Sequence, residues 1–411
     1  MNKLQSVRGT KDLFRISYDN HRAIIDIARN LADIHLYEAI EVPIIEYASV
    51  FDRTLGESSD VVSKEMYVFP DKSSGILALR PEFTASIIRA FITNGWQQHL
   101  PLKLFSYGPV FRYDRPQAGR QRQFHQLNYE NLGDSSPLSD ARILKLAKDL
   151  IKRLEMDSDV VLEINSLGCF ESRKKYNQIL FDYFSKYESS LSNDSKKRLY
   201  NNPLRILDSK DPNDKEISLS CPSIEVSYTN ESHLRFESVL KYLDIFNIEY
   251  KINKRLVRGL DYYCHTAFEF TTDKLSAQNT IIGGGRYDGL CKIMGGCDLP
   301  AIGFAAGLER ISLLKSFTLT KQRPIFILPL QQSTIEYSLK LLSSLQEFNI
   351  KTDIEINGDV DKRIKKAITL NSKYIIFIGQ EELEKNQYKI KNLDTRIELE
   401  LSLDDLIKHC I

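Results

Sequence analysis

The stretch that decides the fold is FRYDRPQAGRQRQFHQ, residues 111–126, in which arginines surround a turn that contains Pro and Gly. An apolar-rich run precedes the turn at residues 102–113 and an alternating run follows it at 123–132, so the pattern predicts a long antiparallel hairpin. The charged residues of the loop are Arg112, Asp114, Arg115, Arg120 and Arg122. Crowded guanidiniums repel one another unless an anion binds, and Arg suits phosphate through planar, bidentate donors. Phosphate binding is therefore favoured over the alternative, a solvated surface turn.

The returning strand has two different faces, because side chains alternate along a strand. One face carries Gln126, Asn128 and Glu130, and the other carries His125, Leu127 and Tyr129. The polar face continues the arginine loop, although an exposed edge strand would show the same alternation. LRPEFTAS (79–86) and RGLDYYCHT (258–266) add Arg80, Glu82, a further arginine and two tyrosines. Such acceptors and hydroxyls suit an amine or imidazole ligand.

Two further features limit the chemistry. His125 and His265 have no Ser or Cys nucleophile motif nearby, so we interpret both as hydrogen-bonded structural residues. GFAAG (303–307) lacks the GxGxxG spacing, so no nicotinamide cofactor is expected. The run predicts instead a strand-to-helix turn that places Arg310 about one helical turn on, over a phosphate.

Composition sets the class of protein. The chain has 411 residues, 27% charged and 42% hydrophobic, which indicates two or three globular domains. Its 56 Lys and Arg nearly balance 55 Asp and Glu, so any attraction to nucleic acid must come from local patches. No apolar stretch approaches the roughly 18 residues of a membrane span and no signal core is evident, so we expect a cytoplasmic protein without membrane contact. Six scattered cysteines, without CxxC or HExxH, give no expected metal site or disulfide framework.

The pattern along the chain predicts two domains. Residues 1–320 form the first, with a mostly helical insertion around 170–250. A strand at residues 40–45 contains Pro43, which cannot donate to a ladder and so belongs at an edge or an interface. From residue 321 to 411, strands and helices alternate as in a doubly wound α/β domain. In that domain one basic cluster could contact phosphates, and it consists of Lys362, Arg363, Lys365 and Lys366.

Taken together, these segments resemble the class II aminoacyl-tRNA synthetases, and within them the histidyl-tRNA synthetase family. The resemblance begins at VRGTKDLF (7–14) and covers nearly the whole chain. The Pro43 strand resembles motif 1, residues 111–126 resemble motif 2, and GFAAGLER (303–310) resembles motif 3. These three motifs alone leave prolyl, threonyl and glycyl enzymes open. The histidine-specific segments that the chain resembles are LVRGLDYYCHTAFEF (256–270) and GGGRYDGL (283–290).

The resemblance implies an α+β fold: an antiparallel six-stranded sheet flanked by helices, followed by an anticodon-binding α/β domain. It implies a homodimer formed through motif 1. It also implies a histidine–tRNA ligase, which activates L-histidine with ATP and Mg²⁺ and transfers it to the 3′ end of tRNA(His). The alternative is a non-catalytic, synthetase-like regulatory or tRNA-sensing protein. Such a relative would be expected to lack the RGLDYY segment or the C-terminal domain, and this chain has both.

The resemblance also implies roles for individual residues. Arg112 and Arg258 would act at the α-phosphate of ATP, and the alternative for Arg258 is an ion pair with Asp261 or another carboxylate. Phe124 would stack on adenine and Arg310 would bind the far phosphates. The residues around histidine would be Glu82, Thr84, Gln126, Glu130, Tyr262 and Tyr263. The contacts to the tRNA acceptor end would be Gln117, Arg115 and Arg120. The departures from the family pattern are Phe83, Asp114 and Asn128.

Overall fold

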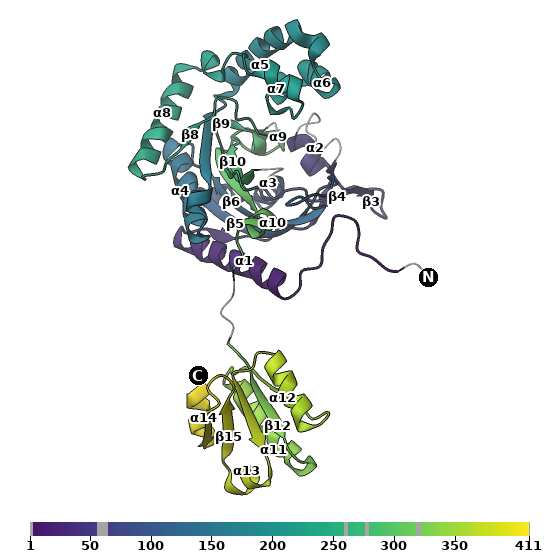
Figure 1. Cartoon of the computed structure of the whole chain (residues 1–411). Helices are drawn as coiled ribbons and strands as arrows, with labels where there is room; N and C mark the ends of the chain where they lie inside the picture. Colours follow the sequence, from purple (N-terminus) through teal and green to yellow (C-terminus); the bar gives the residue numbers. More distant parts are fainter. Residues whose placement is uncertain (1–2, 56–64, 259–261, 276–278, 318–321, 411) are drawn as a thin grey trace. The chain divides into compact units, whose positions relative to one another are not determined.

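A computed structural model of the chain describes residues 3–55, 65–258, 262–275, 279–317 and 322–410. The chain forms two compact units, Met1–Thr318 and Leu319–Ile411 (Figure 1). The predicted boundary between residues 320 and 321 lies outside the described residues. Each unit has hydrophobic clusters of its own, so each has the core of a separate domain.

The first unit is built on a sheet with the strand order β1-β5-β6-β11-β10-β9-β7-β8 in the described part of the chain. In that order the strands span Glu38–Ala39, Leu102–Phe111, Gln123–Leu132, Ala301–Gly307, Thr280–Arg286, Cys264–Thr271, Val161–Ser166 and Lys251–Ile252. The strands from β5 to β7 pair antiparallel, and β1 and β8 add in parallel at the two edges. Six strands of this sheet are therefore antiparallel, and the two parallel edge strands, which were not predicted, bring the sheet to eight in the described residues. Each added strand has only two residues, too few to show a period in the sequence.

The predicted hairpin is confirmed. Strands β5 and β6 pair from Leu102 opposite Leu132 to Phe111 opposite Gln123. The expected alternation along β6 is also present, since Leu127 and Tyr129 are buried among apolar side chains of one cluster. The opposite face of β6 is thereby left to its polar residues.

Helices cover both faces of the sheet. One face packs against α1 (Ile16–Ile34), α4 (Pro137–Arg153), α8 (Asn230–Ile245) and α10 (Leu308–Leu314). The other packs against α2 (Ser49–Leu55), α3 (Thr84–Thr93), α9 (Leu290–Ile293) and α5 (Phe170–Phe184). Helix α4 starts where Ser136 accepts a hydrogen bond from the Ser139 N–H at 3.2 Å, with Pro137 at the first helical position. Among the described helices, none is both long and apolar enough to span a membrane.

The predicted insertion consists of helices and the turns that join them in the described residues. After α5 it continues through η4 (Ser185–Ser190), α6 (Asn193–Asn201), η5 (Pro203–Asp208), α7 (Pro212–Ser218) and η6 (Ile224–Ser227). Helix α8 differs from these, because Val239 and Leu243 are buried against the main sheet. The last helix of the segment thus serves the main core.

The predicted single strand at residues 40–45 is wrong. Strand β1 ends at Ala39 and β2 (Ile45–Tyr47) begins a separate three-stranded sheet with β4 (Ile76–Leu79) and β3 (Val68–Pro70). Between them the carbonyls of Val42 and Pro43 accept hydrogen bonds from Arg80 Nη1, at 2.6 and 3.5 Å. A side chain therefore satisfies backbone groups that a sheet ladder would otherwise pair.

The second unit has a five-stranded sheet of order β13-β12-β14-β15-β16 in its described residues. The strands span Thr352–Ile354, Ile325–Pro329, Tyr374–Ile378, Tyr388–Asn392 and Glu398–Leu401. The helices are α11 (Ile335–Glu347), α12 (Val360–Thr369), α13 (Gln380–Lys385) and α14 (Leu403–Cys410). The first three strands are parallel, as predicted for a doubly wound domain, whereas β15 and β16 form an antiparallel hairpin.

Candidate active site

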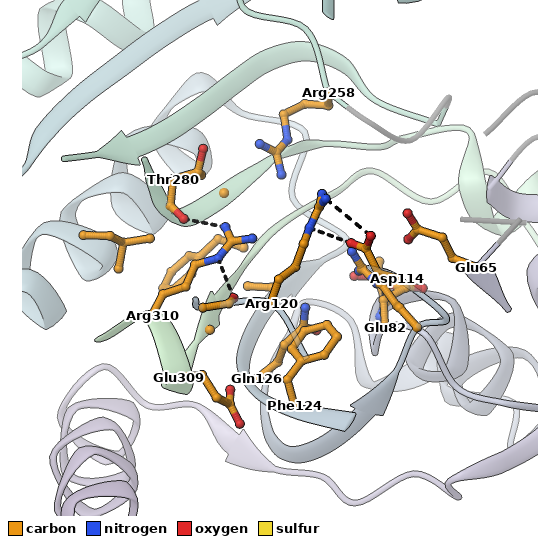
Figure 2. A pocket seen from close by; sticks show the side chains of 18 of the residues that line it. Glu65, Glu82, Asp114, Arg120, Phe124, Gln126, Arg258, Thr280, Glu309 and Arg310 are labelled. Atoms are coloured by element: carbon orange, nitrogen blue, oxygen red, sulfur yellow. Dashed lines mark hydrogen bonds and ion pairs between the residues drawn. The ribbon is translucent and has the colours of Figure 1, made fainter. Parts of the chain in front are cut away.

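A cavity lies over the polar face of β6 and is walled by β10, β11 and the loop between β5 and β6 (Figure 2). Most of the predicted site residues line it: Glu82, Thr84, Arg112, Arg120, Phe124, Gln126, Arg258, Tyr262, Tyr263 and Arg310. Three others do not. Glu130 is buried behind Thr84, and Arg115 and Gln117 are exposed on the hairpin loop. The sheet register thus brings residues from four distant segments into one space.

Four arginines of the described residues line the cavity, together with four carboxylates. Arg112 Nε donates to the Pro81 carbonyl at 3.0 Å, and Arg120 pairs with Asp114 at 2.5 Å. Arg310, in the first turn of α10, donates to the Thr280 carbonyl at 2.6 Å. Burial, together with the charges of Arg112 and Arg120, lowers the pKa of Arg310 to about 10. Cations that disfavour one another's charge in this way are stabilised by a bound polyanion.

Arg258 forms an ion pair with Glu269 on β9, not an isolated charge. The second oxygen of Glu269 accepts a hydrogen bond from the Thr280 hydroxyl at 2.7 Å. Burial alone would lower the pKa of Arg258, but Glu269 and the neighbouring tyrosines outweigh it and raise that pKa. The guanidinium packs directly on Gly283, where a β-carbon would lie 2.5 Å from Nη2. Asp261, the partner considered from the sequence, lies outside the described residues.

Glu130 is the most deeply buried carboxylate next to the cavity, at 1% exposure. It accepts hydrogen bonds from the Thr84 hydroxyl at 2.6 Å and from the Tyr287 hydroxyl. Burial raises the pKa of Glu130 to about 7 because no cation offsets the loss of water. Gly303 lies against this carboxylate, and any β-carbon there would collide with it.

The remaining polar groups of the cavity differ in whether they already have a hydrogen-bond partner within the protein. Glu82 accepts the backbone N–H groups of Thr84 and Ala85, both at 2.7 Å, so it caps the start of α3. Gln126 Oε1 is buried and has no hydrogen-bond partner within the described residues. Tyr262 and Tyr263 form an aromatic wall with ring centroids 4.6 Å apart. A buried acceptor without a partner beside a cavity indicates that a bound ligand donates a hydrogen bond to it.

The three departures from the family pattern have local explanations. Asp114 pairs with Arg120 and also accepts the Arg115 backbone N–H at 2.6 Å, so it shapes the loop. Phe83 is fully buried, with the Arg80 guanidinium 4.2 Å from its ring centre. Asn128 Nδ2 approaches the Phe304 carbonyl at 3.4 Å. None of these contacts removes a charged group from the cavity.

Several lining residues were missed from the sequence, among them Glu65, Thr280, Tyr287 and Glu309. Tyr287 lies within GGGRYDGL, so its segment was singled out but its contact with Glu130 depends on β10 crossing the sheet. The histidines were treated as structural. His125 Nδ1 is indeed hydrogen-bonded, to Glu309 at 3.0 Å, whereas His265 Nδ1 has no partner in the described part of the chain.

An antiparallel sheet that presents a hairpin-loop arginine and a strand-to-helix arginine to one cavity defines the catalytic unit of a class II aminoacyl-tRNA synthetase. A sequence model described as histidyl-tRNA synthetase matches residues 9–174 and 222–311, and one described as anticodon binding domain matches 324–411. The chain belongs to the histidyl-tRNA synthetase family. The unmatched residues between 174 and 222 fall within the helical insertion.

Relatives match over nearly the full length. A histidine–tRNA ligase of Rickettsia bellii is 54% identical over 407 residues, covering 99% of this chain and 98% of the relative. One of Orientia tsutsugamushi is 52% identical over 414 residues, with 99% and 98% covered. The crystal structure of apo histidyl-tRNA synthetase from S. aureus superposes with a TM-score of 0.84 at 32% identity, covering 99% of both chains. A histidyl-tRNA synthetase from Nostoc sp., at 19% identity and a TM-score of 0.69, shares the fold.

Proposed function

We propose that this chain is a histidine–tRNA ligase, which joins L-histidine and ATP into histidyl-adenylate and pyrophosphate and then esterifies the 3′ end of tRNA(His). The observation that carries this proposal is a cavity lined by several arginines and by Gln126, whose acceptor is unpaired in the described residues, with the buried carboxylate of Glu130 directly behind its wall. The arginines suit a triphosphate. The acceptors, Glu130 and Gln126, suit the N–H groups of an imidazole.

In this mechanism the protein positions ATP and histidine and offsets the negative charge of the phosphates. No nucleophilic side chain is needed. Arg112 and Arg258 contact the α-phosphate, where negative charge develops as the histidine carboxylate attacks. Phe124 stacks on adenine and Arg310 binds the far phosphates. Glu82, Thr84, Gln126, Glu130, Tyr262 and Tyr263 surround the amino acid. Hydrogen bonds to both imidazole nitrogens give selectivity, because a ligand without them leaves buried polar groups unpaired.

Mg²⁺ fits this cavity as the companion of ATP. Glu65 and Asp114 line it and offer the oxygen ligands that Mg²⁺ prefers together with phosphate. When bound, the ion neutralises charge on the phosphates. The protein's own arginines hold the triphosphate in place.

The second unit would bind the anticodon, and the hairpin loop would reach the acceptor end of tRNA. Arg115 and Gln117 are exposed on that loop, and Arg120 joins the loop to the cavity wall. We therefore place residues 321–411 as the anticodon-binding domain and 1–320 as the catalytic domain. We also propose that the reaction takes place in the cytoplasm.

A homodimer is supported by apolar side chains on the small sheet of β2, β4 and β3. Ile45 and Tyr47 are 50% and 62% exposed on one face of this sheet, and Val68 and Ile76 are 48% and 52% exposed on the other. Exposed apolar side chains on a short sheet with open edges are normally covered by a partner. Mass measurement in solution at micromolar concentration should give a dimer, and a fully active monomer would contradict this.

The decisive experiment is pyrophosphate exchange into ATP with single amino acids. Histidine should support exchange, and proline, threonine and glycine should not. Exchange with proline but not histidine would refute the proposal. No exchange with any amino acid, with retained tRNA binding, would indicate the non-catalytic alternative.

A further inference from the structure

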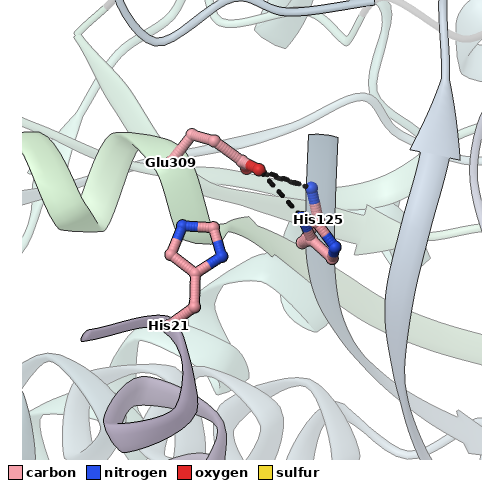
Figure 3. Close-up of side chains that lie close together, drawn as sticks. All are labelled: His21, His125 and Glu309. Atoms are coloured by element: carbon pink, nitrogen blue, oxygen red, sulfur yellow. Dashed lines mark hydrogen bonds and ion pairs between the residues drawn. The ribbon is translucent and has the colours of Figure 1, made fainter. Parts of the chain in front are cut away.

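Two histidines and a glutamate from three distant segments meet at the edge of the cavity. His21 lies on α1, His125 on β6 and Glu309 in the first turn of α10 (Figure 3). One ligand-capable atom from each residue lies within 4.8 Å of the others. The mechanism proposed above uses none of these three side chains.

His21 is the unsatisfied member of this group. It is 6% exposed, and its Nδ1 is buried without a hydrogen-bond partner among the described residues. Its ring meets that of His125 edge-on, with centroids 5.4 Å apart. A buried ring nitrogen normally finds a donor or an ion, so this one calls for an explanation.

We propose that His21, His125 and Glu309 bind one divalent metal ion of the kind represented by Zn²⁺. Zinc takes nitrogen ligands at about 2.0–2.1 Å and carboxylate oxygen at about 2.0–2.2 Å, so two ligands of one ion lie about 3.0–3.5 Å apart. His125 Nδ1 and Glu309 Oε1 already stand at 3.0 Å. A shift of the His21 ring toward them completes a set of three protein ligands.

The donor set decides the kind of metal. Two imidazoles and one carboxylate suit Zn²⁺, Co²⁺ or Ni²⁺, whereas Mg²⁺ prefers oxygen alone. Three protein ligands also leave a fourth position for water, as in open zinc sites. The site is therefore distinct in chemistry from the Mg²⁺ that accompanies ATP.

The surroundings already orient the glutamate. The His125 backbone N–H donates to both carboxylate oxygens of Glu309 at 3.0 Å, which holds the group while one oxygen turns to the ion. Glu309 lines the cavity and directly precedes Arg310. The ion would thus tie α1 and β6 to the turn that carries Arg310.

The test is metal binding to the full-length, chelator-treated protein. We expect one equivalent of Zn²⁺ by calorimetry, a Co²⁺ absorption spectrum with nitrogen ligation, and a rise in melting temperature with Zn²⁺ but not with Mg²⁺. His21→Phe keeps a ring in the core and should weaken Zn²⁺ binding by at least about tenfold. Glu309→Gln, which keeps the side-chain shape, should do the same.

The matched control is His233→Phe. His233 faces Glu237 at 3.4 Å on the surface, as a histidine–carboxylate pair that lies outside this three-residue group. The His233→Phe variant should bind Zn²⁺ with the same affinity as the unaltered protein. Absence of saturable Zn²⁺ binding, or equal affinity in His21→Phe and His233→Phe, would overturn the proposal and leave the three residues as a hydrogen-bonded cluster.

Discussion

The buried cluster around Asp140 and the cavity around Arg258 contain the same kinds of side chain but differ in how fully these are paired. Arg286 is completely buried, and it donates through Nε to Asp140 at 2.9 Å and through Nη1 to Asp288 at 2.9 Å. Asp140 also accepts from Arg235 at 3.2 Å and from the Thr266 hydroxyl at 2.6 Å. Each charge of this cluster thus faces an opposite charge within the protein, although Arg235 Nε has no hydrogen-bond partner in the described residues.

The cavity differs from this cluster at its buried carboxylate. Arg258 has its carboxylate partner in Glu269, but Glu130 has only hydroxyl partners and no cation in the described residues. Two consecutive residues connect these regions. Arg286 belongs to the Asp140 cluster, and Tyr287 donates to Glu130 beside the cavity. Paired charges therefore give rigidity on one side of β10, and unpaired groups give binding capacity on the other.

The largest effect should come from breaking the paired cluster. Asp140→Ala leaves Arg286 and Arg235 without their shared carboxylate in a buried site, which should cost about 3–5 kcal/mol of unfolding free energy. Asp26→Ala removes an exposed carboxylate that faces Arg22 at 3.7 Å, and should cost at most about 1 kcal/mol. Urea unfolding measures both. Equal stability of the two variants would show that the Asp140 cluster is not the support described here.

Removing Arg258 should act on rate instead. Arg258→Ala should slow single-turnover adenylate formation by about 10² or more, or about 2.7 kcal/mol, since one preorganised donor at the α-phosphate is lost. Histidine binding should change little and the protein should remain folded, with a lower melting temperature because Glu269 loses its ion-pair partner. Arg255→Ala is the control, because Arg255 is exposed outside the cavity, where it donates to the Leu219 carbonyl. A destabilised but fully active Arg258→Ala variant would show that Arg258 serves only as the structural ion-pair partner of Glu269.

The unpaired carboxylate predicts a dependence on pH. The pKa of Glu130 is about 7 in the folded protein against an ordinary value of 4.5, so the folded state holds a proton that the unfolded state has released. This contribution to stability is complete below about pH 4.5 and is lost as the pH rises through about 7. Glu130→Gln, measured without ligand, should lack this loss and gain on the order of 3 kcal/mol relative to the unaltered protein by pH 8. Parallel stability curves for both proteins would contradict a raised pKa.

Sequence patterns predicted the parts of this site that depend on local geometry. A period of two placed Gln126 and Glu130 on one face of β6, and the glycine run placed Arg310 at a strand-to-helix turn. The pairs that decide chemistry were not predictable in this way. Glu269 meets Arg258, and Tyr287 meets Glu130, only after non-local strands fix their register. The alternation of residues along a strand predicts which face a side chain lies on. It does not predict which residue of a distant segment that side chain contacts.

The same limit explains one error and one omission in the predicted fold. The residues around Pro43 read as one strand, yet Arg80 takes their carbonyls. The edge strands β1 and β8 were absent from the prediction because two-residue strands carry no pattern. Both the error and the omission arise because backbone groups pair with residues distant in the sequence.

The smallest predicted effect extends the comparison to α12 in the second unit, where most of the predicted basic cluster is already paired. Arg363 is buried and donates to the Pro329 carbonyl at 2.6 Å, Lys366 pairs with Glu355, and Lys362 faces Asp359 at 3.2 Å. Lys365 is exposed, without an ion-pair partner in the described residues, so it is the cation most available to a tRNA phosphate. Lys365→Ala should weaken tRNA binding only about two- to threefold and reduce the salt dependence by about one phosphate contact. Lys340→Ala, which removes an exposed lysine paired with Glu336 at 2.9 Å on α11, should leave both unchanged. Indistinguishable salt slopes for the two variants would place the phosphate contacts of this unit away from α12.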